Sequence, residues 1–70
     1  MQKNKGAELL SKQVEKLGSY RAAAEALSVN VSDVYNWCNE GRVPKLEYAS
    51  RIETKFKIKM ASWLVQNDTE

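Results

Sequence analysis

Residues 19–37 contain two short helical patterns joined by a tight turn, and this segment limits the possible folds more than any other. The first pattern, residues 20–27, is rich in alanine and strongly favours a helix. The second begins at Asn30, a residue type that often caps a helix N-terminus. Ala24 leaves room for the two helices to approach each other. A small shared core can form from Leu27, Val29, Val34 and Trp37. The segment therefore predicts two helices that cross steeply, at about 90–120°.

The residues before this unit also carry a helical pattern. Residues 7–17 place apolar side chains at helical spacing, and Gly18 then provides a typical helix end. The apolar stripe consists of Leu10, Val14 and Leu17. Ser19 is a suitable N-cap for the next helix.

Further helices are predicted downstream. The helix that begins at Asn30 is expected to end before Gly41, and Pro44 suits the first turn of a fourth helix. The inner side of this fourth helix is expected to consist of Leu46, Ala49, Ile52 or Glu53, and Phe56. Residues 59–66 are apolar enough for a short fifth helix, which is favoured over a strand pair because no turn signal divides them. The sequence thus predicts an all-α fold, a compact bundle of four to five short helices.

Seventy residues are enough for one small domain. Its core must be thin, because a chain of this length buries only about 60% of its unfolded surface. We expect residues 7–66 to form the domain. Residues 1–6 are polar and are expected to form a flexible N-terminal arm, and residues 67–70 a disordered tail.

Several classes of protein are excluded by composition. The chain has no histidine and one cysteine, Cys38, so neither an internal disulfide nor a zinc site is expected. It has no nucleophile–base pair and no glycine-rich phosphate loop, so no enzyme, cofactor or small-molecule ligand is predicted. No apolar run has transmembrane length and no signal-peptide pattern is present, which predicts a cytoplasmic protein without a membrane partner.

The sequence YRAAAEALSVNVSDVYNW, residues 20–37, resembles the helix-turn-helix of Cro-like phage repressors and lambda-repressor-like proteins. The following NEGRVPKLEYASRIE, residues 39–53, resembles the Val-Pro step and Arg-Ile-Glu helix ending of that family. The chain departs from the family at Ser28, where members usually have glycine, and at Tyr20, where many have a phosphate-binding glutamine. Serine is less favourable than glycine in a left-handed turn. The resemblance implies a sequence-specific transcriptional regulator that binds double-stranded DNA, as a repressor at a palindromic operator.

The outward face of the helix at residues 30–39 provides a separate argument for DNA binding. At 100° per residue, Val34, Trp37 and Cys38 share the inner side. The opposite side carries short neutral donors and acceptors, whereas a helix that merely faces water usually carries Lys and Glu. Asn can pair with adenine, Ser with several base edges, and Val with a thymine methyl group. The predicted base contacts are Val31, Ser32, Tyr35, Asn36 and Asn39.

Phosphate contacts are expected to flank this face. The candidates are Tyr20, Arg21, Arg42 and Lys45, which lie at predicted helix starts or in the loop. The formal net charge of +2 is too small to indicate a nucleic-acid partner by itself.

The apolar segment near the C-terminus has two interpretations. It can cover the thin core, or it can form the interface of a weak or DNA-assisted homodimer, which is slightly favoured because palindromic sites pair with two-fold dimers. The candidate interface residues are Met60, Trp63, Leu64 and Val65. An alternative function is an antitoxin or another protein-interaction module, with this segment as the partner site. A helical bundle without DNA affinity is a third alternative.

Overall fold

The computed structural model describes residues 4–64, which form a single all-helical unit. Its elements are α1 (Lys5–Leu17), α2 (Tyr20–Leu27), α3 (Val31–Asn39), α4 (Leu46–Phe56) and the 3-10 helix η1 (Met60–Leu64). This described range contains no strand, which confirms the all-α class. None of its helices has the length and apolar character needed to cross a membrane.

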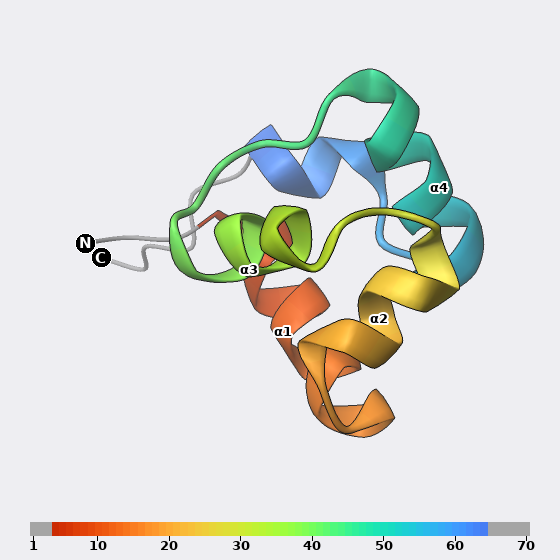
Figure 1. Cartoon of the computed structure of the whole chain (residues 1–70). Helices are drawn as coiled ribbons and strands as arrows, with labels where there is room; N and C mark the ends of the chain where they lie inside the picture. The colour runs from red at the N-terminus through yellow and green to blue at the C-terminus, as the bar shows by residue number, and fades with distance from the viewer. Residues whose placement is uncertain (1–3, 65–70) are drawn as a thin grey trace.

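Helix α1 contacts α2, α3 and η1, and Figure 1 shows it next to α2 and behind α3. Helix α2 packs against α3 and also against α4, while η1 returns to α1 from the end of the chain. Each of the five elements contributes at least one of the largest fully buried side chains, which are Trp63, Leu10, Leu27, Ile52, Val34 and Cys38. The core is therefore shared by residues that lie far apart in the sequence.

Helix α1 begins at Lys5, two residues earlier than the sequence pattern predicts. Its N-cap is the buried Asn4, whose side-chain oxygen accepts a hydrogen bond from the Ala7 amide at 2.7 Å. The Asn4 amide group also donates to the Gly41 carbonyl at 3.2 Å. Residues 4–6 thus belong to the folded unit rather than to the predicted arm. Residues 1–3 and 65–70, including the predicted tail, lie outside the described residues.

The start of α4 also differs from the prediction. The helix begins at Leu46 and not in the turn that contains Pro44. Lys45 keeps an extended backbone with φ −62° and ψ 158°, so Pro44 lies before the helix, where it is buried. Ala49 and Ile52 face the core as expected, whereas Leu46 is 73% exposed because it lies at the solvent side of the first turn.

Within the described residues the C-terminal helix begins at Met60, one residue later than predicted, and takes the 3-10 form. The indole ring of its Trp63 completes the core. Trp63 is only 2% exposed and lies directly against Gly6 of α1. A Cβ atom at Gly6 would overlap the six-membered ring of Trp63. The close contact of η1 with α1 therefore requires a residue without a side chain at position 6.

We predict that Gly6→Ala lowers the free energy of unfolding by about 1–3 kcal/mol, because the added methyl group overpacks a core ring that cannot move aside. Urea denaturation followed by circular dichroism measures the change. Lys5→Ala, at the exposed neighbouring position, is the control and should leave stability nearly unchanged. Equal stability of Gly6→Ala and the wild type would contradict the described packing of Trp63.

Candidate functional site

The connection between α2 and α3 is a turn with one left-handed residue. Ser28 has φ 59° and ψ 46°, a conformation that costs an L-residue roughly 1–2 kcal/mol. The Val29 amide donates to the Ala24 carbonyl at 3.0 Å, which closes the end of α2. Asn30 then caps α3 with an extended backbone, without a side-chain hydrogen bond. Ser28 thus adopts the left-handed backbone conformation, although glycine would adopt it more easily.

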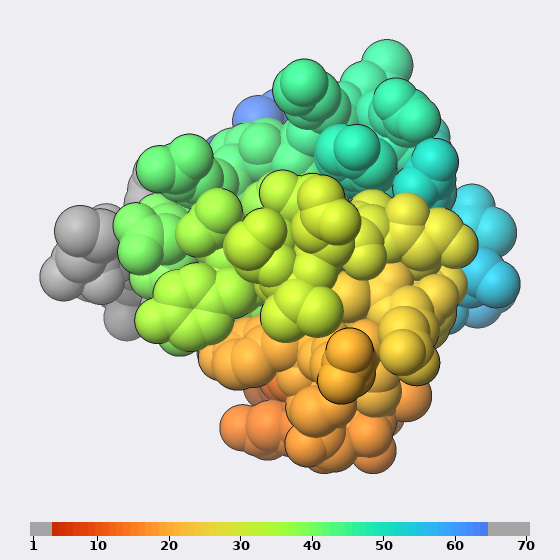
Figure 2. Space-filling view, in the orientation of Figure 1, coloured from red at the N-terminus to blue at the C-terminus, as the bar shows by residue number. Residues whose placement is uncertain are grey.

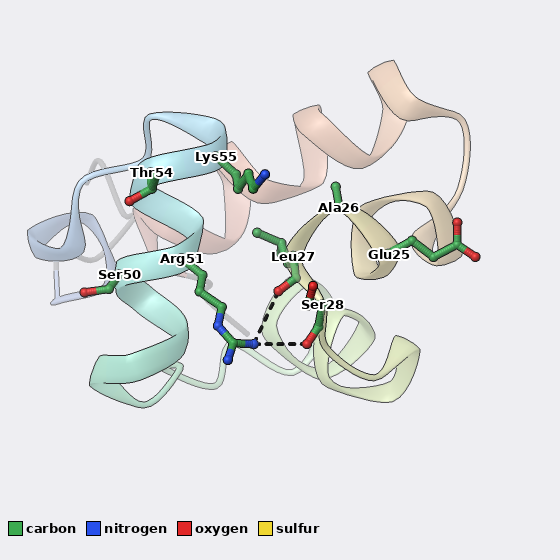
Figure 3. A pocket seen from close by; sticks show the side chains of 8 residues that line it. All are labelled: Glu25, Ala26, Leu27, Ser28, Ser50, Arg51, Thr54 and Lys55. Carbon is green, nitrogen blue, oxygen red and sulfur yellow. Dashed lines mark hydrogen bonds between the residues drawn. The ribbon is translucent and has the colours of Figure 1, made fainter.

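Arg51 of α4 reaches across to this turn, as Figure 3 shows. Its guanidinium Nη1 donates to the Ser28 carbonyl at 3.0 Å and to the Leu27 carbonyl at 3.4 Å. Its Nη2 donates to Glu47 at 3.3 Å, and its Cζ lies 5.3 Å from the centre of the Tyr48 ring. The two carbonyls belong to the end of a helix, where no intrahelical donor is available. Arg51 therefore ties α4 to the turn.

Sequence patterns could not identify this role of Arg51. The residues that it contacts at the turn lie 23 and 24 positions away, and nothing local distinguishes it from a solvated arginine on a helix surface. The only local signal is its spacing of four residues from Glu47, which predicts an ion pair within α4.

Helix α3 presents the predicted faces. Val34, Trp37 and Cys38 are buried in the core. The outward side of α3 lies at the middle of one molecular face, between α2 and the segment that leads into α4 (Figure 2). Among the predicted base contacts, Val31 is 43% and Tyr35 48% exposed. Ser32 and Asn39 are also exposed, and Asn36 is half-buried.

Tyr20, Tyr35 and Asn39 form a small cluster where the start of α2 meets the end of α3. The Asn39 Nδ2 donates to the Tyr20 hydroxyl oxygen at 3.0 Å and to the Tyr35 carbonyl at 3.2 Å. The rings of Tyr20 and Tyr35 meet edge to face, with their centres 5.5 Å apart. The cluster thus joins a predicted phosphate contact to two predicted base contacts.

Charged side chains border the α3 face. Arg42 and Lys45 are exposed, and they line a shallow hollow together with Asn36 and Asp33. On the α2 side, the Arg21 Nε lies 4.0 Å from a Glu25 carboxylate oxygen, and both side chains are largely exposed. Such an exposed pair is weak, so Arg21 remains available to another anion. Arg42 and Lys45 thus lie beside Asn36 of α3, whereas Arg21 lies on α2, next to the Tyr20 that contacts Asn39 at the end of α3.

The predicted dimer residues are separated by the structure. Trp63 belongs to the core and cannot contribute to an interface while the domain is folded, so that part of the prediction is wrong. The indole is buried because it packs on Gly6. Met60 is 37% and Leu64 79% exposed. Val65 lies outside the described residues.

No group of three or more potential metal ligands occurs within residues 4–64. Comparison of the chain with models of protein families, with curated proteins and with solved structures found no match.

We predict that Ser28→Gly raises the free energy of unfolding by about 1 kcal/mol, because glycine adopts the left-handed conformation without the steric cost of a Cβ atom. Thermal denaturation measures the change. Ser50→Gly, at an exposed position within α4, is the matched control and should lower stability. A loss of stability at both sites would contradict the turn geometry.

We also predict that Arg51→Met lowers the free energy of unfolding by about 1 kcal/mol, since the aliphatic stem is retained but the hydrogen bonds to the turn are lost. Hydrogen exchange should show faster exchange of the Val29 amide, which closes the turn. Glu47→Gln is the control, because it removes the weak ion pair within α4 and leaves the contact with the turn intact. A similar rise in Val29 exchange in this control would argue against a specific role of Arg51.

Proposed function

We propose that the protein is a sequence-specific DNA-binding regulator in which α2, the turn at residues 28–30 and α3 act as a helix-turn-helix. The observation that carries the proposal is the outward face of α3, where neutral polar and small apolar side chains occupy the middle of one molecular face. The exposed basic side chains of Arg42 and Lys45 line a hollow beside this face. An α-helix fits the major groove, and such side chains match the edges of base pairs.

In this function α3 enters the major groove and the flanking groups hold the phosphate backbone. Val31 contacts a thymine methyl group, and Ser32 and Tyr35 bond to base edges through their hydroxyls. The side-chain amide of Asn36 carries a donor and an acceptor, the pair needed for adenine. The proposed phosphate contacts are Tyr20, Arg21, Arg42 and Lys45. These contacts position the protein but do not select a sequence.

The resemblance to Cro-like phage repressors supports repression as the regulatory outcome. Occupying an operator blocks polymerase without a further domain. We propose that two copies bind the half-sites of a palindromic operator, with centres roughly 34 Å apart. The exposed Met60 and Leu64 are the candidate contacts of this weak or DNA-assisted homodimer.

A second candidate function is binding to a protein partner, as in an antitoxin of the same fold. The exposed apolar side chains of α4 and η1 favour it, above all Leu46 at 73% and Leu64 at 79% exposure. Enrichment of DNA sequences separates the two candidates, because a module that acts only on protein selects no duplex.

Selection of binding sites from random duplex DNA tests the main proposal. The expected result is an enriched half-site together with a steep fall in affinity as salt increases, because each phosphate contact releases counterions. A pool without any enriched sequence would refute sequence-specific regulation.

Two substitutions test the assignment of residues. Asn36→Ala should change the preference at one base position by about 1–3 kcal/mol. Arg42→Ala should weaken binding to all sequences similarly and reduce the slope of log affinity against log salt by about 1. Titrations of both variants against the selected duplex and its single-base variants provide the measurement. If the two variants affected every sequence alike, the proposed docking of α3 would be incorrect.

A further inference from the structure

We infer that Asn39 is not a base-reading residue but a positioning residue, which orients the hydroxyl of Tyr20 toward a DNA phosphate. The inference rests on the proposed function and deepens it. It assigns the end of α3 and the start of α2 to one phosphate-binding unit, defined by Tyr20, Asn39 and Tyr35.

The hydrogen bonds of Asn39 occupy the atoms that base pairing would need. Its Nδ2 faces two oxygens, the hydroxyl of Tyr20 at 3.0 Å and the carbonyl of Tyr35 at 3.2 Å. An amide nitrogen has two hydrogens, so these contacts use its full donor capacity. Recognition of adenine by asparagine requires a donor and an acceptor together. Asn39 would have to give up one of its present bonds to contact adenine in this way.

The orientation of the Asn39 amide follows from its partners. The carbonyl of Tyr35 is only an acceptor, so the atom of Asn39 that faces it must be the nitrogen. The same nitrogen then meets the oxygen of Tyr20, which acts as the acceptor in that bond. Asn39 therefore holds a defined rotamer, anchored to the backbone of its own helix.

This arrangement has a direct consequence for the Tyr20 hydroxyl. A phenolic group has one hydrogen to donate and lone pairs to accept. Because its oxygen already accepts from Asn39, its own hydrogen is directed to another acceptor. Tyr20 lies at the first position of α2, against Asn39 and Tyr35 of α3. An anionic phosphate oxygen is a strong acceptor at such a place.

Tyr35 limits the movement of the Tyr20 ring. The two rings pack at an angle of 67° with their centres 5.5 Å apart. Two residues of α3 therefore restrain the Tyr20 side chain, Tyr35 through the ring contact and Asn39 through its hydrogen bond. Fixing the ring before DNA arrives reduces the side-chain entropy lost on binding. Tyr20 and Asn39 are thus arranged to present one donor rather than to recognise one base, and the Tyr35 ring supports them.

A double-mutant cycle tests the inference with duplexes selected by the wild-type protein and with an unrelated duplex. Tyr20→Phe removes only the hydroxyl, and Asn39→Ala removes the group that orients it. We expect each variant to weaken binding to both duplexes by about tenfold, the effect of one hydrogen bond to a charged group. The double variant should bind no worse than Tyr20→Phe, because Asn39 acts through the hydroxyl.

The opposing outcome is equally defined. If Asn39→Ala changed the preferred base at one position, or if its effect multiplied with that of Tyr20→Phe, Asn39 would be a base-reading residue and the inference would be overturned. Asn36→Ala is the matched control on the same helix, and it should alter base preference. Circular dichroism should show that all variants remain helical, since the Tyr20–Asn39 hydrogen bond and the Asn39 side chain are exposed.

Failure of the inference can be distinguished from failure of the proposed function. Base selection by the wild type, combined with a base-specific effect of Asn39→Ala, would reject only the positioning role. Absence of duplex binding by the wild type would reject both the positioning role and the proposed function.

A measurement on the free protein tests the hydrogen bond directly. Nuclear magnetic resonance should show that the Asn39 side-chain NH₂ signals shift in Tyr20→Phe, and unchanged signals would also reject the positioning role.

Discussion

The exposed face of α3 depends on the left-handed turn at Ser28. Ser28, with φ 59°, lies in the three-residue connection that brings α3 against α2. Ala23 and Ala24 of α2 are fully buried and add little volume, which suits close packing of α2 against its neighbours. Arg51 donates to the two carbonyls that the turn leaves without helical partners. The conformational cost of a non-glycine residue is therefore offset by a contact from α4.

A second constraint acts where η1 packs against α1. A chain of this length has few residues to bury, and Trp63 supplies the largest fully buried side chain. Its ring can reach α1 only because position 6 is glycine. The same helix contacts α2 and α3, so the indole supports the elements that carry the proposed DNA contacts. A residue near the C-terminus thus helps to position a face formed by the middle of the chain.

The proposed interface combines neutral recognition with charge at its borders. The centre of α3 offers Val31, Ser32 and Asn36, which suit the edges of bases rather than phosphates. Arg42 and Lys45 flank one side, and the cluster of Tyr20 with Asn39 flanks the other. This division is compatible with the proposed DNA contacts even though the formal net charge is only +2. The local arrangement of charges matters more than their sum.

The sequence by itself determined the helices and the two faces of α3. Helical periodicity and caps depend on residues within one or two turns, so Ser19, Gly18 and the buried Val34 could be interpreted without tertiary information. Only the tertiary structure decided which polar groups meet across elements. The contact of Arg51 with Ser28 and that of Asn39 with Tyr20 join residues 23 and 19 positions apart, and no periodic pattern encodes such pairs. It also decided that Trp63 belongs to the core, because its burial depends on the missing side chain at position 6.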